Sequence, residues 1–348
     1  MSEFAEQTIL DFHTYPPVGT DDWQYAFQTA QVRALETQML TRAVLLDMIN
    51  AQNFEQAVDL LSGSEYALPQ GAKDFSQVEK TLQQRRTDVR ELFSDLMLDE
   101  SIVQLFKARD DFANLRLALR RSLTEKPIGA DYSPDGNVAP EQLEQLFAEQ
   151  GEFSSQECIE FVQQAVEQAV LAYYLDKDIR QVDYQIDSFQ AAYNLRTACR
   201  LNSVFLLSLF RTQIDLTNIR TMFRQKFTNS EETKVFLTGG FVESERFKNC
   251  LEHGYEALGQ LFFATPYNRI VEIGASYITS NKSFLKIEQQ CEEYLTGFLK
   301  SSFEITAGPQ PVIAFLLLKE NEIRTVRLIL TARKNFLDTK LILDRIGQ

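Results

Sequence analysis

A ten-residue motif with the pattern of a helix occurs three times in this chain, and its recurrence constrains the fold more than any other feature. The copies begin at Asp111, Asp215 and Glu322, so 104 and 107 residues separate them. In each copy an acid precedes apolar residues that recur with a helical period, and an arginine stands five residues after the acid. Short helical motifs recur by chance, but the nearly equal spacing indicates internal repetition. The motif residues are Asp111, Arg116 and Arg120, then Asp215, Arg220 and Arg224, and finally Glu322 and Arg327, where Thr331 replaces the second arginine.

The acid at the start of each motif is expected to be the N-cap of a helix. A capping carboxylate accepts hydrogen bonds from the free N–H groups of the first helical turn and favours the positive end of the helix dipole. A helical run also precedes each motif, at residues 102–109, 204–211 and 312–320. We therefore predict two helices that meet at an acidic cap, and we predict this arrangement three times.

The chain as a whole is predicted to be all-α, because no segment shows sustained strand alternation. The repeat fits three helical units, which we place at residues 1–127, 128–230 and 231–348, with an irregular arm at residues 1–20. The boundaries follow from the turn-forming residues of 126–136 and 228–240.

The net charge disfavours some classes of partner. Lys and Arg total 35 while Asp and Glu total 49, which gives −14 at neutral pH. Nucleic-acid binding needs a basic surface to neutralise phosphates, so it is disfavoured, as is simple electrostatic docking on anionic lipid. We interpret the charge first as a solubility feature and second as a surface for a basic protein partner.

The cysteines and the apolar segments predict the cellular compartment of the chain and whether it crosses a membrane. The four cysteines are widely spread and form no C-x-x-C pair, which indicates a reduced, intracellular protein. The first residues lack the basic and apolar regions of a signal peptide. The most apolar segments, residues 204–210 and 312–318, are far shorter than the roughly 18 residues of a membrane span. We therefore expect no transmembrane segment.

No residue pattern predicts a catalytic, cofactor or metal site. The two histidines, His13 and His253, lack the neighbours of a zinc site, and no nucleophile elbow or phosphate-binding glycine loop is found. The Asp110-Asp111 pair resembles the Mg²⁺-binding motif of isoprenoid diphosphate enzymes, in which carboxylates on one helix face hold the metal. Only the second acid recurs in the other copies, which suits a cap better than a metal cluster. This enzyme and a free helical scaffold are the alternative functions.

The arginines of the motif allow two interpretations. In the structural one, Arg116, Arg220 and Arg327 pair with carboxylates of a neighbouring helical unit and fix how the units pack. In the functional one, they form a set of equivalent charges that faces an inserted partner. We favour the structural interpretation, because repeat proteins need contacts between their units first.

Four segments of the sequence resemble a known family. They are residues 25–36, residues 57–66, residues 183–198 with the Ile-Asp-Leu-Thr-Asn-Ile-Arg of 214–220, and residues 319–327. Their order and spacing are similar to those of the C subunit of prokaryotic V/A-type rotary ATPases, which corresponds to the d subunit of the vacuolar enzyme. Two features depart from the family pattern: the irregular first 20 residues, and Thr325, where asparagine is expected.

The resemblance implies a funnel-shaped, all-α protein of three helical units about a pseudo-threefold axis, with no active site, cofactor or small-molecule substrate. It implies one copy per complex at the cytoplasmic face of a membrane, seated on the rotor ring of proteolipid subunits. The foot of the axle, made of D-type and F-type subunits, enters its cavity. The implied task is mechanical: such a socket passes torque between ATP hydrolysis or synthesis and the transport of H⁺ or Na⁺.

Overall fold

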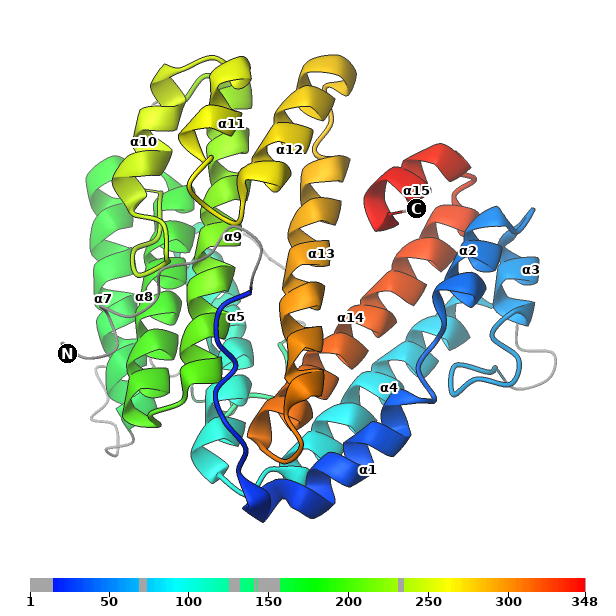
Figure 1. Cartoon of the computed structure of the whole chain (residues 1–348). Helices are drawn as coiled ribbons and strands as arrows, with labels where there is room; N and C mark the ends of the chain where they lie inside the picture. Colours follow the sequence, from blue (N-terminus) through cyan, green and yellow to red (C-terminus); the bar gives the residue numbers. More distant parts are fainter. Residues whose placement is uncertain are drawn as a thin grey trace. The chain divides into compact units, whose positions relative to one another are not determined.

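The computed structural model describes residues 15–68, 74–124, 132–140, 142, 157–230 and 235–347. The regular structure of these residues is helical (Figure 1), apart from one isolated bridge between Ser62 and Ser64, so the all-α prediction is confirmed. No helix in these ranges is both long and apolar enough to span a bilayer. The funnel shape and the pseudo-threefold arrangement stay predictions.

The described α-helices are α1 (Ala26–Glu36), α2 (Arg42–Asn50), α3 (Phe54–Asp59), α4 (Phe75–Leu96), α5 (Glu100–Thr124), α7 (Glu157–Asp176), α8 (Ile179–Arg200), α9 (Val204–Thr228), α10 (Ser244–Glu252), α11 (Leu258–Leu261), α12 (Asn268–Asn281), α13 (Leu285–Ser301), α14 (Pro309–Lys334) and α15 (Thr339–Ile346). Short 3-10 helices are η1 (Trp23–Tyr25), η2 (Tyr255–Ala257) and η3 (Ser302–Glu304).

The chain packs as two compact units. The middle unit comprises Asp99–His253, and the terminal unit combines Met1–Leu98 with Gly254–Gln348. The division into three helical units at residues 127 and 230 stays a prediction. Parts of both predicted boundaries, residues 125–131 and 231–234, lie outside the described residues, as do residues 1–14 of the predicted arm.

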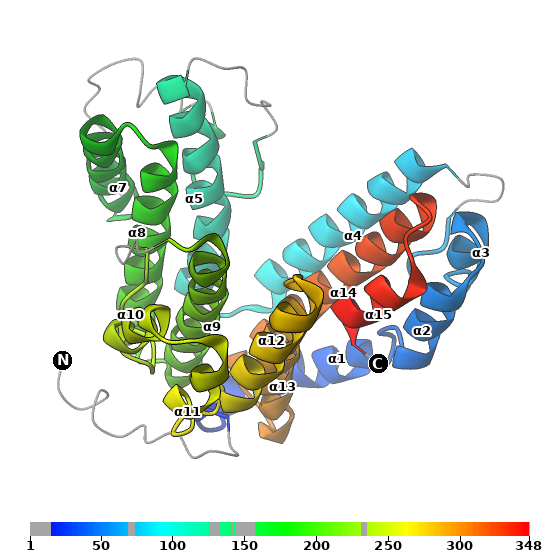
Figure 2. The same cartoon turned by 90° about the horizontal axis from the view of Figure 1, so that it is seen from above.

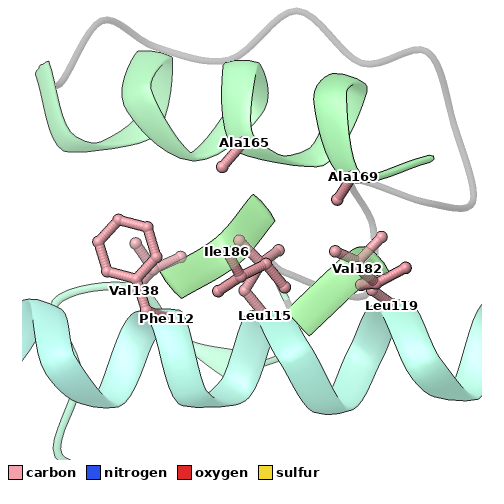
Figure 3. Packing of buried hydrophobic residues seen from close by; sticks show 8 residues of the cluster. All are labelled: Phe112, Leu115, Leu119, Val138, Ala165, Ala169, Val182 and Ile186. Atoms are coloured by element: carbon pink, nitrogen blue, oxygen red, sulfur yellow. The ribbon is translucent and has the colours of Figure 1, made fainter. Parts of the chain in front are cut away.

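In the middle unit, α8 packs against α5, α7 and α9. One apolar cluster joins three of these helices (Figure 3). Its buried members are Phe112, Leu115 and Leu119 of α5, Ala165 and Ala169 of α7, Val182 and Ile186 of α8, and Val138 of the loop after α5. Because alanine is small, α7 can lie close to the larger side chains of α5, as the close packing of a protein interior requires.

In the terminal unit, α14 is the central helix, and α1, α2, α3, α4, α13 and α15 all pack on it. It is buried on most of its faces, so it needs partners on every side. The neighbouring α4 lies along it (Figure 2), and Arg90 Nε on α4 is 2.8 Å from Glu320 Oε1 on α14. Arg345 of α15 holds α13, since its two guanidinium nitrogens donate to the Glu292 carboxylate at 2.7 and 2.6 Å.

The acids of the motif do not cap helices, and this part of the prediction was wrong. Asp111, Asp215 and Glu322 lie inside the continuous helices α5, α9 and α14, each of which covers both helices predicted around the acid. The cap of α9 is Ser203, whose Oγ accepts the N–H of Leu206 at 3.3 Å. A buried carboxylate is tolerated in a helix interior only where hydrogen bonds satisfy it. Here those bonds come from segments that pack on the helix.

Candidate functional site

We call each motif acid, together with the groups that hydrogen-bond to it and to the residue three positions later, a clamp. The first clamp joins the interior of α5 to the loop that follows this helix. Asp111 is fully buried; its Oδ1 accepts the N–H of Val138 at 2.9 Å, and its Oδ2 accepts the Asn137 side-chain amide at 2.8 Å. One turn along, Asn114 Nδ2 donates to the Ser133 carbonyl, and Asn114 Oδ1 accepts the Ser133 N–H, both at 2.8 Å. Two side chains of one helix therefore hold residues 133–138 of this loop at two points.

The second clamp has the same construction on α9. Asp215 is fully buried and accepts the N–H groups of Phe241 at 2.9 Å and of Val242 at 3.1 Å. Asn218 binds Leu237 reciprocally: its Nδ2 donates to the carbonyl, and its Oδ1 accepts the N–H, both at 2.8 Å. The acid and the amide again hold one loop against the helix.

The first and second clamps match residue by residue. In both, 19 residues separate the asparagine from its loop partner, and 27 residues separate the aspartate from the valine that it binds. Two residues before that valine stands a glycine. A Cβ atom on Gly136 would lie 2.2 Å from Asp111 Oδ1, and one on Gly240 would lie 2.0 Å from Asp215 Oδ1. Glycine is required at both positions because the loop backbone passes directly over the carboxylate.

The third clamp, on α14, binds residues from the other end of the sequence. Glu322 Oε2 accepts the N–H of Leu40 at 2.6 Å. Its Oε1 accepts the Tyr66 hydroxyl at 2.6 Å and Lys319 Nζ at 2.5 Å. Lys319 also pairs with Glu65, the residue before the tyrosine. The acid of the third copy therefore accepts hydrogen bonds from a backbone N–H, a hydroxyl and an ammonium group.

The third clamp differs from the others in its motif residues and in the sequence distance that it bridges. Thr325 stands where the first two copies have asparagine, and its hydroxyl donates to the Asn321 carbonyl of its own helix at 2.9 Å. Leu40 and Tyr66 are 282 and 256 positions away from Glu322. The third copy of the arrangement is thus assembled from two distant parts of the sequence.

Burial sets the electrostatics of the clamps. Burial raises the pKa of the Asp111 carboxyl, and the hydrogen bonds from Val138 and Asn137 act in the opposite direction. In the third clamp, burial and the nearby Glu322 carboxylate raise the pKa of the Tyr66 hydroxyl, which therefore stays protonated and donates. Lys319 supplies the positive charge that this buried carboxylate needs.

The arginines of the first motif copy contact carboxylates of α8. Arg116 pairs with Asp187 and lies 3.6 Å from Asp183, and Arg120 Nε donates to Asp183 at 3.0 Å. Burial raises the pKa of the Asp187 carboxyl, and the Arg116 charge opposes this shift. These pairs link α5 to α8, two of the helices that the apolar cluster joins.

The other motif arginines lie on α14 and α9. In the terminal unit, Arg327 Nε is 3.0 Å from Glu79 Oε2 of α4. This pair and those of Arg116 link residues that the sequence analysis assigned to different helical units. The roles of Arg220 and Arg224 on α9, in packing or in contact with a partner, stay predictions.

A turn that occurs twice in the chain positions Tyr66 in the third clamp. Ser64 Oγ donates to the carbonyl three residues before it at 2.8 Å and accepts the N–H two residues after it at 3.1 Å. Thr265 makes the same two bonds, at 2.8 and 3.3 Å. The residue two positions later is a buried tyrosine in both turns, Tyr66 and Tyr267. The similar sequences 60–66 and 261–267 therefore encode the same turn.

Sequence reasoning found the acids but missed the groups that they bind. Asn114 and Asn218 stand three residues after the acid, and Gly136 and Gly240 follow 25 residues after it. An alignment of the first two copies shows both shared residues, so the sequence did contain a signal for these partners. Leu40 and Tyr66, the distant partners of Glu322, had no such signal, because they precede it by more than 250 positions.

The contacts of Asp111 argue against the isoprenoid diphosphate enzyme. Both carboxylate oxygens accept hydrogen bonds from the loop, and Asp110 beside it is also buried. Within the described ranges, no group of histidine, cysteine, aspartate or glutamate side chains has the arrangement of a metal site. His13 lies outside these ranges. The geometry of the Asp110-Asp111 pair is that of a structural element.

Comparison with known proteins decides the family. A model of the family described as ATP synthase (C/AC39) subunit matches residues 28–345, which include all three motif copies. The chain belongs to this family. The resemblance inferred from the four sequence segments is thereby confirmed.

Relatives from this family cover nearly the same length. The C subunit of the V-type sodium ATPase of Enterococcus hirae is 22% identical over 329 residues, which are 91% of this chain and 96% of that protein. The C subunit of the A-type ATP synthase of Methanocaldococcus jannaschii is 21% identical over 336 residues, covering 89% of this chain and 82% of its own. That of Methanobrevibacter smithii is 23% identical over 338 residues, covering 90% and 85%.

Proposed function

We propose that this chain is the non-catalytic C subunit of a V/A-type rotary ATPase and acts as a socket between the rotating axle and the proteolipid ring. One copy per complex, at the cytoplasmic face of the membrane, transmits torque, so that ATP hydrolysis or synthesis is linked to H⁺ or Na⁺ transport. The observation that carries this proposal is the family match over residues 28–345. The relatives are named as subunits of a V-type sodium ATPase and of A-type ATP synthases.

The clamps suit a mechanical role. A part that transmits torque has to resist sliding between its helices and the segments that join them. Each clamp ties such a segment to the interior of a long helix of 25 or 26 residues, about 38 Å in length. Sliding would leave buried N–H groups and a buried carboxylate without partners, which is costly. This resistance supports the idea of a stiff socket.

Purification of the intact complex tests the proposal. An affinity tag on this chain is used to recover it from detergent-solubilised membranes of its own organism. We expect the D-type and F-type axle subunits and the proteolipid to co-purify with it, one copy of this chain per complex. A free scaffold would bring other proteins, and an isoprenoid diphosphate enzyme would turn over its substrate with Mg²⁺. Recovery without axle or proteolipid subunits would refute the proposal.

The coupling role is tested with Arg220→Ala in the reconstituted complex. If Arg220 supports packing between the helical units, the variant should pump fewer ions per ATP hydrolysed, while ATP hydrolysis itself continues. Arg121→Ala, a change to an exposed arginine of α5 outside the motif set, is the matched control and should leave the ratio unchanged. Unchanged unfolding and an unchanged pumping ratio in Arg220→Ala would exclude this role.

A further inference from the structure

The segment that precedes η1 and α1 packs across two other helices of the terminal unit. It is the dark blue stretch that runs beside α13 in Figure 1. At its beginning, the Tyr15 ring meets the Tyr294 ring of α13 edge to face, with 5.2 Å between the ring centroids. The next residue, Pro16, is buried. We call residues 15–22 the brace.

The other end of the brace is fixed to the loop that leads into α14. The N–H of Asp22 donates to the Ala307 carbonyl at 2.7 Å. Asp21 Oδ1 accepts the N–H of Thr306 at 2.8 Å and that of Ala307 at 3.4 Å. Backbone and side chain of the brace are therefore both bonded to this loop.

A glycine in α13 makes room for Tyr15. Gly297 lies inside this helix of 17 residues, where glycine is less favourable than alanine. A Cβ atom on Gly297 would lie 1.9 Å from the Tyr15 hydroxyl oxygen and 2.5 Å from Cζ, so any other residue would displace the ring. The missing side chain leaves a notch in the surface of α13, and the Tyr15 hydroxyl lies in it. Helix α13 is thus weakened at the position where Tyr15 needs space.

The brace has a hinge between its two ends. Gly19 has φ of 88°, in the left-handed region that glycine adopts readily. Gln310, a buried residue in the first turn of α14, holds the chain on both sides of this glycine. Its Nε2 donates to the Val18 carbonyl at 3.3 Å and to the Thr20 carbonyl at 3.1 Å. Residues 15–18 therefore form an arm that is pinned to α14 at the hinge and reaches α13 at its far end.

The arm is built to be held less tightly than the fixed end. Pro16 and Pro17 have no N–H group, so half of the arm cannot donate a backbone hydrogen bond. Tyr15 is 41% exposed although its hydroxyl lies in the notch. Burial and the nearby Glu293 carboxylate raise the pKa of this hydroxyl, so the neutral phenol is the form that occupies the notch. Segments with few backbone hydrogen bonds and partial burial open locally before the rest of a domain unfolds.

We propose that the brace is a releasable latch that sets how firmly α13 is tied to α14. With Tyr15 in the notch, the arm links α13 to Gln310 of α14. With Tyr15 out of the notch, α13 loses this link while the rest of the terminal unit stays folded. The loop into α14 keeps its place in both states, because Arg33 of α1 donates to the carbonyls of Ser302 at 3.0 Å and Ile305 at 3.3 Å. The terminal unit thereby has a stiffer and a looser state.

Thermal denaturation of the full-length chain tests whether Tyr15 occupies the notch in solution. In a Tyr15→Ala background, Gly297→Ala should raise the thermal midpoint of the terminal unit by about 2–4 °C, because the notch is empty and alanine favours the helix. In the wild type the same change expels the ring, so the midpoint should not rise. Phe27→Ala is the matched control, since Phe27 is an aromatic residue of α1 that is 74% exposed. Gly297→Ala should act in that background as it does in the wild type. An equal rise in the wild-type and Tyr15→Ala backgrounds would overturn the inference.

Two further measurements separate a latch from simple packing. Hydrogen exchange followed by mass spectrometry should be at least about threefold faster at residues 294–301 in Tyr15→Ala, with the middle unit unchanged. Unchanged exchange there would show that Tyr15 does not hold α13, and the inference would be wrong. The difference in alkaline absorbance between the wild type and Tyr15→Phe isolates the Tyr15 phenol, whose pKa should lie above its ordinary value of 10.0 and return towards it in Gly297→Ala. These assays use the isolated chain, so their failure leaves the co-purification test of the proposed function unaffected.

Discussion

Removal of the Asp215 carboxylate is expected to destabilise the middle unit strongly. Asp215→Ala deletes the acceptor of two backbone N–H groups, those of Phe241 and Val242. Hydrogen bonds to charged groups contribute about 1.5–3 kcal/mol each, which gives about 3–6 kcal/mol for the pair. The variant also no longer buries a charge, which offsets part of this cost. We therefore expect a loss of about 3 kcal/mol in the free energy of unfolding.

Urea denaturation followed by circular dichroism measures this loss, and amide hydrogen exchange locates it. Exchange at residues 237–242 should accelerate more than exchange in the terminal unit. Asp111→Ala should cost the same within about 1 kcal/mol, because the first clamp has the same geometry. Gly240→Ala should act like Asp215→Ala, since its Cβ would lie 2.0 Å from the Asp215 carboxylate and would displace it.

The double variant of Asp215→Ala and Gly240→Ala provides the decisive test. If both changes break the same clamp, the combined loss is clearly smaller than the sum of the two single losses. Additive losses, or a cost below about 1 kcal/mol for Asp215→Ala alone, would show that the carboxylate does not hold this loop.

Three further predictions concern single contacts. Tyr66→Phe should cost the terminal unit about 2 kcal/mol, because the buried Glu322 carboxylate loses a hydrogen bond; an unchanged urea midpoint would contradict this. Arg327→Ala should cost less than about 1 kcal/mol, because the side chains of the pair with Glu79 are 39% and 37% exposed; a coupling energy above about 2 kcal/mol in a double-mutant cycle would be inconsistent with it. Because burial raises the pKa of Asp111 in the folded chain above 3.8, the folded state binds this proton more readily, and stability falls as pH rises through the folded pKa. Asp111→Asn should remove that fall, so parallel curves of urea midpoint against pH for the two proteins would refute it.

The sequence predicted the helices better than it predicted their ends. The helical period of apolar residues located α5, α9 and α14, since these helices bury stripes or whole faces. It did not show that each helix continues through its acid. A capping acid and a buried acid look alike in sequence, because both precede an apolar run. For Asp111 and Asp215, only the loop that returns 27 residues later distinguishes the two cases, and local rules do not include it.

The third clamp and the backbone conformation of Phe336 were beyond sequence reasoning for physical reasons. Glu322 binds residues more than 250 positions away, and pairing over such a distance has no local signature. Phe336 stands where helix-ending rules call for glycine or asparagine, so its left-handed backbone was not foreseen. In both cases tertiary contacts decide the conformation, and local preference does not.

The sequence distance bridged by the third clamp has a consequence for synthesis. At roughly 5–20 residues per second, the 256 residues between Tyr66 and Glu322 take on the order of 10–50 s to translate. Until α14 is made, α2, α3 and α4 lack the helix on which they pack, and every residue of the middle unit is translated before α14 begins. Limited proteolysis of chains stalled before residue 309 should therefore find a protected middle unit and a digested segment 15–98, and equal protection of both would contradict this order. The residues translated first are in this way among the last to reach their native contacts.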